Sequence, residues 1–210
     1  MAIAIITIAL TVSANADPIE IVGLTGGDHP TTLGGYDMTL LTPPASGNQS
    51  CTEALSSELI CFEDENEVGV TLTAGDPSWW QYAHGNIFIV HGYHWIDLVL
   101  PPNTRAISLF VGASMNGRAW IQATDGTYTT PQEHFPIASG NTRGYGIHAT
   151  GCEALTRVTV EPWEWGFGYL AINQGECQSV PEPGTLALLG LGLLGMALAR
   201  RTQRSRQLIT

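Results

Sequence analysis

The chain has 210 residues, of which 44% are hydrophobic and only 13% charged, and its formal net charge is −11. All eight basic residues are arginines and four of them lie after residue 199, so the stretch from Asp17 to Val180 carries 18 acidic residues against four arginines, a net charge of −14. This length suits one domain and hardly two, and a body this acidic argues against nucleic-acid binding, which depends on basic side chains neutralising phosphates.

The N-terminal stretch MAIAIITIALTVSANADP has the pattern of a secretory signal. An apolar run, Met1–Val12, precedes Ala14-Asn15-Ala16, which is an A-x-A cleavage site. We therefore predict a signal peptide over residues 1–16, with Asp17 as the first mature residue. No Lys or Arg precedes the run, so either the amino terminus supplies the positive charge or the natural start lies upstream. A buried N-terminal strand or helix is the alternative.

From residue 17 to residue 178, apolar residues come in short bursts that are separated by Gly, Pro, Asn and Asp. The clearest passage is Ile87–Ala113, in which side chains alternate between two faces and Pro101-Pro102-Asn103 ends one strand. The other predicted strands are Ile19–Leu24, Tyr36–Leu41, Ser57–Phe62, Glu67–Thr73, Arg118–Thr124, Tyr145–Ala149, Leu155–Glu161 and Gly166–Asn173. Ten or eleven short strands without helical periodicity predict an all-β domain, a single β-sandwich or jelly-roll-like fold over residues 17–178.

Four cysteines fit a chain that reaches an oxidising compartment. Pairing of neighbours along the chain predicts two disulfides, Cys51–Cys61 and Cys152–Cys177. Each would stabilise the fold by about 2–4 kcal/mol.

An acidic run contains Glu63, Asp64 and Glu65. We interpret it as a solvated hairpin turn between the strands Ser57–Phe62 and Glu67–Thr73. The alternative is a Ca²⁺ site, because this hard cation prefers oxygen ligands, although the run lacks the spacing of an EF-hand loop.

Two pairs of tryptophans suggest a carbohydrate contact: Trp79 with Trp80, and Trp163 with Trp165. Exposed aromatic planes near carboxylates and amides are the surfaces that sugars contact. Alternation along the chain would turn one ring of each pair outward, whereas large rings are more often buried.

The sequence does not predict an enzyme. A glycosidase needs two carboxylates placed across a cleft, and the sequence places no such pair. The chain has no G-x-S-x-G elbow, H-E-x-x-H helix or phosphate-binding glycine loop.

The end of the chain, VPEPGTLALLGLGLLGMALARR, differs from the acidic body. Pro181, Glu182 and Pro183 precede an apolar segment, residues 184–199, and then Arg200 and Arg201. As a helix this segment would be about 24 Å long at ~1.5 Å per residue, short of the ~30 Å hydrocarbon core. It therefore predicts a marginal, transient membrane anchor, with the arginines holding its end in the cytoplasm. An ordinary C-terminal anchor is the alternative.

Pro-Glu-Pro, a short Leu/Gly/Ala segment and Arg-Arg, in this order, resemble the PEP-CTERM sorting signal, here over residues 179–210. The resemblance implies export in a Gram-negative bacterium and processing at Pro181–Pro183 by an exosortase. It also implies a place at the cell surface or outside the cell, in association with exopolysaccharide and biofilm matrix. We therefore expect an exported, non-enzymatic surface or matrix protein without a cofactor other than the Ca²⁺ alternative. A carbohydrate-binding module is the alternative, and a polysaccharide hydrolase is the third.

Overall fold

A computed structural model describes residues 17–25, 27–42, 46–55, 58–75, 87–90, 95–113, 116–137, 142–161, 165–168 and 170–176. The chain divides into two units, Met1–Gln178 and Ser179–Thr210, and every described residue belongs to the first. The predicted signal peptide and the predicted segment 184–199 lie outside the described residues. In the part that is described, no helix has the length and hydropathy that crossing a membrane requires.

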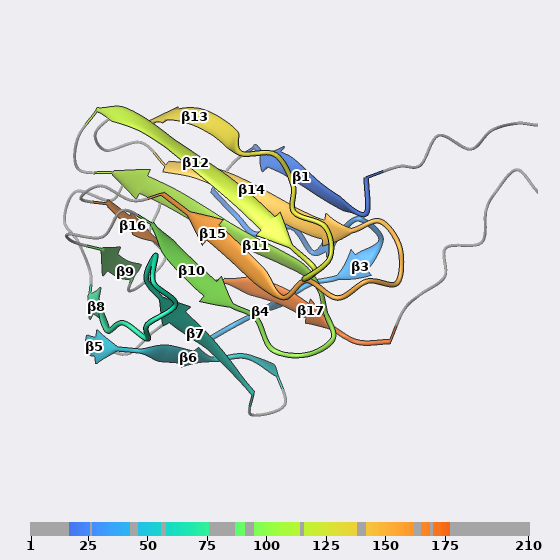
Figure 1. Cartoon of the computed structure of the whole chain (residues 1–210), viewed down its shortest axis with the longest axis horizontal. Helices are drawn as coiled ribbons and strands as arrows, with labels where there is room; N and C mark the ends of the chain where they lie inside the picture. Colours follow the sequence, from blue (N-terminus) through green and yellow to red (C-terminus); the bar gives the residue numbers. More distant parts are fainter. Residues whose placement is uncertain are drawn as a thin grey trace, which may run out of the picture. The chain divides into compact units, whose positions relative to one another are not determined.

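The described body consists of antiparallel β-strands in three sheets (Figure 1). The nine-stranded sheet has the order β1-β14-β11-β16-β9-β8-β5, with β17 beside β11 and β4 beside β17; the six-stranded sheet has the order β13-β12-β15-β10-β7-β6; and β2 pairs with β3. The strands are β1 Ile19–Leu24, β2 Thr32–Leu33, β3 Tyr36–Asp37, β4 Thr39–Leu40, β5 Gly47–Gln49, β6 Cys51–Glu53, β7 Leu59–Glu63, β8 Leu72–Gly75, β9 Ile87–Val90, β10 Ile96–Val99, β11 Thr104–Ala113, β12 Gly117–Thr124, β13 Glu133–Ile137, β14 Thr142–Ala149, β15 Arg157–Val160, β16 Trp165–Phe167 and β17 Ala171–Gln174.

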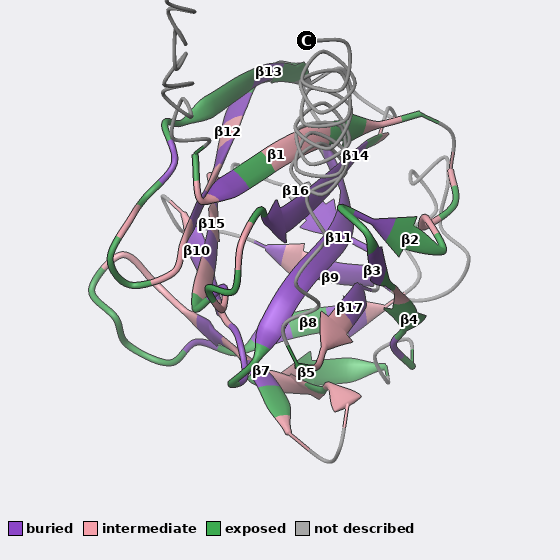
Figure 2. Cartoon of the chain, turned by 90° about the vertical axis from the view of Figure 1, so that its right-hand side faces the viewer, coloured by how far each residue is buried: buried purple, intermediate pink, exposed green. Residues whose placement is uncertain are grey.

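The two larger sheets face each other across one hydrophobic core. Phe62 of the six-stranded sheet contacts Phe88 and Phe167 of the nine-stranded sheet, with ring centroids 4.7 Å and 5.8 Å away. The core is continuous with buried residues of both sheets, and β11 is buried along most of its length (Figure 2). The predicted all-β fold is therefore confirmed, as two sheets packed face to face.

The side of the nine-stranded sheet that faces away from this core is covered closely because β14 carries glycines there. A Cβ on Gly144 would lie 2.5 Å from Cε1 of Phe110, and one on Gly146 would lie 2.6 Å from Cδ1 of Leu33. These glycines let Phe110 and Leu33 pack directly on the backbone of β14. Both side chains belong to small hydrophobic clusters outside the main core.

The acidic run forms a hairpin turn, as predicted, but the returning chain pairs with β7 only briefly. Glu63 bridges Gly69, and the amide of Val70 donates to the carbonyl of Phe62. The chain then crosses to the nine-stranded sheet, where β8 pairs with β5 and β9. The two strands predicted to flank this turn therefore lie in different sheets.

The predicted bridge between Cys51 and Cys61 is present and joins β6 to β7. The two residues are direct partners in the strand register, and their Cα atoms are 4.1 Å apart. Cys152 is also disulfide-bonded, whereas its predicted partner Cys177 lies outside the described residues.

Removing the Cys51–Cys61 bridge should lower stability measurably. The loop that it closes has a sequence separation of 10, and chain entropy for a loop of this size predicts a loss of about 2–3 kcal/mol in the free energy of unfolding. Denaturant titration of the Cys51→Ser/Cys61→Ser double variant tests this. Thr52→Ser, next to Cys51 on β6, is the control, and a loss below about 0.5 kcal/mol in the double variant would contradict the expectation.

Candidate functional site

The sandwich is open at one edge, where β1 ends the nine-stranded sheet and β13 ends the six-stranded sheet. Two adjoining hollows of about 400 Å³ and 360 Å³ occupy this opening. We call them together the edge groove. The first is lined by Ile21, Gly23, Leu24, Glu133, His134, Phe135, Thr142, Arg143, Gly144 and Tyr145, and the second by Asp17, Ile19, Glu20, Ile21, Tyr128, Thr130, Pro131, Glu133 and Thr150.

Strand alternation carries polar side chains into the edge groove. On β14, Arg143, Tyr145 and Ile147 are two residues apart and share the face turned toward the other sheet. Ile147 is fully buried and Arg143 is exposed, so this row of side chains leads from the core to solvent. On β13, Glu133 shares a face with the buried Phe135 in the same way.

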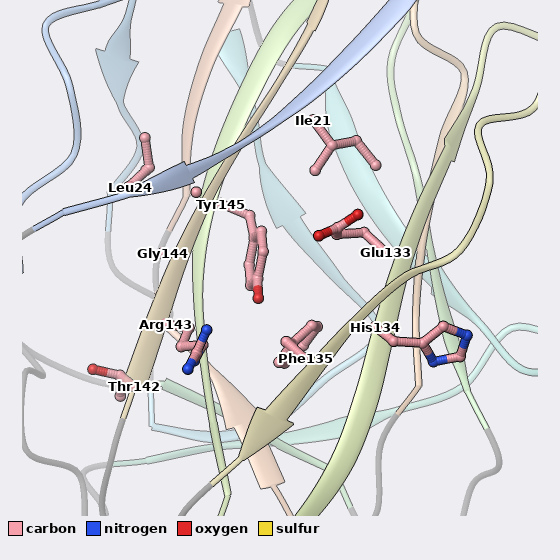
Figure 3. A pocket seen from close by; sticks show the side chains of 10 residues that line it. Ile21, Leu24, Glu133, His134, Phe135, Thr142, Arg143, Gly144 and Tyr145 are labelled. Carbon is pink, nitrogen blue, oxygen red and sulfur yellow. The ribbon is translucent and has the colours of Figure 1, made fainter.

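The first hollow has an aromatic floor and a polar rim (Figure 3). The rings of Phe135 and Tyr145 have centroids 4.8 Å apart and are tilted by 41°. The carboxylate of Glu133 is directed toward Tyr145, whereas the ring of His134 points away from the other labelled side chains (Figure 3).

Tyr145 is held in its neutral form. Burial raises the pKa of its phenol, and the negative charge of Glu133 adds to this, while the charge of Arg143 and its hydrogen bond to Tyr145 act in the opposite direction. The resulting pKa is about 12. At neutral pH the Tyr145 hydroxyl is therefore a hydrogen-bond donor and acceptor and not a base.

The second hollow is acidic. Burial and the neighbouring carboxylate of Asp17, which also accepts a hydrogen bond, raise the pKa of the Tyr128 phenol. The hydroxyl of Thr150 donates to the backbone carbonyl of Asp17 at 2.7 Å. The carboxylate of Glu20 lies on the opposite face of β1, where one of its oxygens is 3.5 Å from Nε2 of His148. Asp17, the predicted first mature residue, is thus part of the groove.

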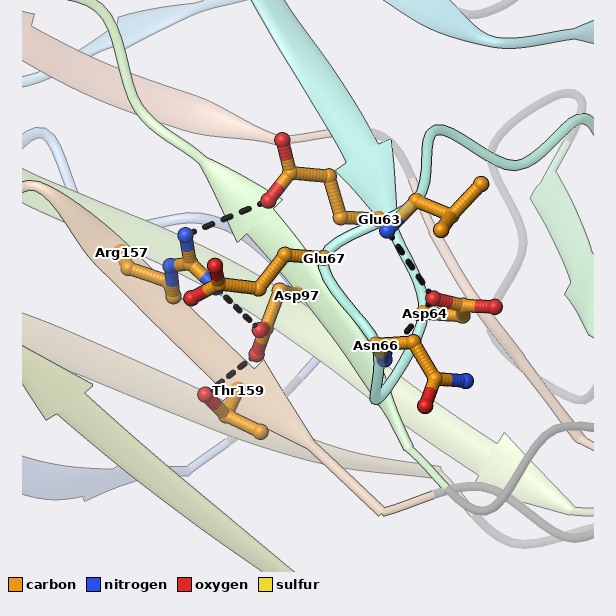
Figure 4. Close-up of polar contacts among 8 residues, drawn as sticks. Glu63, Asp64, Asn66, Glu67, Asp97, Arg157 and Thr159 are labelled. Atoms are coloured by element: carbon orange, nitrogen blue, oxygen red, sulfur yellow. Dashed lines mark hydrogen bonds and ion pairs between the residues drawn. The ribbon is translucent and has the colours of Figure 1, made fainter.

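The acidic run begins at the end of β7 in the six-stranded sheet. Arg157 of β15 forms ion pairs with Glu63 of this run and with Glu67 and Asp97 (Figure 4). Arg157 donates to Oδ2 of Asp97 at 2.6 Å, and its guanidinium lies 3.2 Å from Glu63 and 3.6 Å from Glu67. Burial lowers the pKa of Arg157, but the hydrogen bond and charge of Asp97, and then the two glutamates, offset this and raise the pKa.

Asp64 organises the turn itself. Its Oδ1 accepts hydrogen bonds from the amides of Asn66 and Val68, at 2.9 Å and 3.0 Å, and these bonds lower its pKa. Within the described ranges, no three His, Cys, Asp or Glu side chains form a group that would hold a metal. Ca²⁺ binding by Glu63, Asp64 and Glu65 stays a prediction.

The tryptophans predicted to contact a glycan lie largely outside the described residues. This applies to Trp79, Trp80 and Trp163, and of Trp165 only the backbone in β16 is described. The structure instead shows Trp95, which immediately precedes β10, beside Trp120 of β12, with ring centroids 6.1 Å apart. Both are partly buried.

The edge groove could not be predicted from the local sequence pattern. Its polar groups come from Glu133 and Arg143, which belong to different sheets. The alternation of Arg143, Tyr145 and Ile147 was readable in the sequence, but β13 contains Pro136 and shows no clear apolar alternation. Nothing local indicated that these two strands would lie at the same edge.

Replacing Arg157 should destabilise the body because Asp97 is buried, with a side-chain exposure of 7%. In Arg157→Met, Asp97 keeps the hydroxyl of Thr159 as a partner but loses its counter-charge, at a cost of about 2–3 kcal/mol. Chemical denaturation measures this loss. Arg118→Met, at an exposed position on β12, is the matched control, and equal stability of the two variants would contradict the interpretation.

Tyr145 should make stability depend on pH in the alkaline range. Its pKa rises from 10.0 to about 12 in the folded chain, so the neutral phenol contributes its full stabilisation below pH 10 and loses it as pH rises through 12. Tyrosinate absorbance should show a transition near pH 12 that is missing in Tyr145→Phe. Loss of a transition near pH 10 in that variant would show that the phenol is not held neutral by the fold.

The comparisons with known proteins concern the end of the chain. The family model of the PEP-CTERM protein-sorting motif matches residues 179–201. No curated protein and no solved structure matches the chain. The matched range contains the predicted processing residues Pro181, Glu182 and Pro183 and the predicted membrane-stop residues Arg200 and Arg201. The chain therefore carries a PEP-CTERM sorting motif, which marks it as an exported protein that an exosortase processes.

Proposed function

We propose that this chain is a non-enzymatic protein of the cell surface or extracellular matrix, associated with exopolysaccharide and biofilm. The observation that carries the proposal is the sorting motif at residues 179–201. In this proposal residues 1–16 direct export, the segment 184–199 with Arg200 and Arg201 holds the chain briefly in the inner membrane, and the exosortase cuts at Pro181–Pro183. The body of residues 17–178 then reaches the surface or the medium.

The edge groove supports binding rather than catalysis. Its central hydroxyl, on Tyr145, has a pKa of about 12 and is therefore not ionised at neutral pH. Glu133 and Arg143 at its rim are both exposed. Together these groups offer several hydrogen bonds to a ligand.

The sequence also suggests two other functions, which experiments can distinguish. A carbohydrate-binding module that uses Trp79, Trp80, Trp163 or Trp165 would lose glycan binding when these residues are changed to alanine. A polysaccharide hydrolase would show turnover that is lost when a single carboxylate is changed to its amide. A matrix protein without either property would show neither effect.

The sorting proposal predicts two cleavages, which intact mass spectrometry of the protein from each cell fraction would detect. The wild-type protein at the surface or in the medium should lack residues 1–16 and the segment beyond Pro-Glu-Pro. Pro181→Ala/Pro183→Ala should keep its C-terminal segment and stay in the membrane fraction, because the processing enzyme no longer recognises the motif.

The control is Glu176→Gln, an exposed acidic residue just before the motif, which should be processed like the wild type. A wild-type protein of full C-terminal length in the inner membrane would mean that the tail is an ordinary anchor, and the proposal would be wrong.

A further inference from the structure

We infer that the edge groove binds a glycan segment that is neutral or carries amines, and that it discriminates against glycans rich in uronic acids. The inference rests on the proposed function, because it names the class of matrix polysaccharide that the body would bind. It does not depend on the four tryptophans that the sequence suggested.

The edge groove has a form that suits a chain of linked sugar rings. Its two hollows, of about 400 Å³ and 360 Å³, share Ile21 and Glu133, so they form one elongated depression along the open edge. Each alone lies within the ~300–1,000 Å³ that small-molecule sites occupy. An oligosaccharide would place successive sugar rings in the two hollows, whereas a single small molecule would fill only one hollow.

The first hollow is lined by a mixture of aromatic and polar groups. Phe135 and Tyr145 provide an apolar floor, on which the C–H face of a sugar ring would rest. The hydroxyl of Tyr145, the guanidinium of Arg143 and the carboxylate of Glu133 surround this floor (Figure 3). A sugar presents this combination, with apolar C–H faces and hydroxyls around its rim that both donate and accept.

The same groups make a peptide strand a poorer occupant. Strand addition to a sheet edge draws its affinity from backbone amides and carbonyls. In the edge groove the polar groups that converge are side chains that point between the two sheets, from Glu133 on β13 and from Arg143 and Tyr145 on β14. Side-chain donors and acceptors of this kind match the hydroxyls of a sugar better than they match the regular backbone of a peptide strand.

The charge of the groove also favours such a ligand. Two carboxylates, on Asp17 and Glu133, face one guanidinium, on Arg143. The body around it carries 18 acidic residues and four arginines. A polyanion would therefore be repelled both at long range and in the groove, while an amine would find carboxylates in both hollows.

Isothermal titration of the full-length chain in detergent tests this with three oligosaccharide series of equal length: neutral β-1,4-linked glucose, β-1,4-linked glucosamine and galacturonate. We expect glucosamine oligomers to bind at least as tightly as glucose oligomers, and galacturonate oligomers at least tenfold more weakly. Added salt should weaken glucosamine binding and leave glucose binding nearly unchanged.

Three groove variants separate the roles of the groups. Tyr145→Phe keeps the ring and should weaken glucose and glucosamine binding about 3- to 10-fold, the effect of one lost hydrogen bond. Arg143→Gln should weaken glucose binding. Glu133→Gln should weaken glucosamine binding several-fold more than glucose binding, because it removes a charge that only the amine uses.

Glu53→Gln is the matched control for charge, since Glu53 is exposed on β6 at the opposite end of the six-stranded sheet. Gln132→Ala is the control for position, since Gln132 is exposed next to Glu133 but lines neither hollow. Both should bind like the wild type. Circular dichroism should show that all variants remain folded.

Three outcomes would overturn the inference: no binding of any series, binding that the groove variants leave unchanged, or tight binding of an extended lysine-containing peptide that oligosaccharides do not displace. None of these bears on sorting, which cell fractionation and intact mass report independently. A correctly processed surface protein that binds no glycan in this groove would end the inference and leave the proposed export intact.

Discussion

The structure depends on the contact between the inner faces of its two large sheets. Phe62 reaches from β7 to Phe88 and Phe167 across the core, and these three rings are among the largest fully buried side chains. Because the strands of each sheet bury every second residue against the other sheet, neither sheet is stable without its partner. The positions of the strands, and of the groups that they carry, follow from this contact.

The edge groove marks the place where this core ends. Along β1 the inward positions change from a buried Ile19, through a half-buried Ile21, to an exposed Gly23. On β14 the same row passes from Ile147 through Tyr145 to Arg143. A charged side chain can face inward only where solvent reaches it, so the rim of the sandwich is the natural position for Arg143 and Glu133. Tyr145 lies between the two regions, with its ring in the core and its hydroxyl beside Arg143.

Much of the fold could be predicted from local pattern, because alternation is a local property. The passage Ile87–Ala113 contains the whole of β9, β10 and β11, and cysteines that are close in sequence indicated the bridge between β6 and β7. Short strands without strong alternation, such as β5 and β13, were missed. The pattern also could not show that the strands on either side of the acidic turn join different sheets, because sheet membership depends on long-range packing.

The candidate site could not be predicted from the sequence either, because it too depends on long-range packing. Glu133, Arg143 and Asp17 lie far apart in sequence or in different sheets, and each looks like an ordinary surface charge by itself. Only the pairing of β14 with β1 and of β13 with β12, together with the packing of the two sheets, brings them to one opening. The Arg157 cluster shows the same limit, since its acidic partners come from β7, the turn and β10.

The two ends of the described body explain how such a domain is compatible with processing at both termini. Every described strand lies between Ile19 and Gln174, so the two expected cleavages would remove none of them. Near the C-terminal end, the buried Arg105 donates to the backbone carbonyls of Gly175 and Cys152, and β17 pairs with β11 and β4. At the N-terminal end, Thr150 binds the carbonyls of Asp17 and Pro18. Hydrogen bonds to the rest of the body thus hold the chain just inside each expected cleavage.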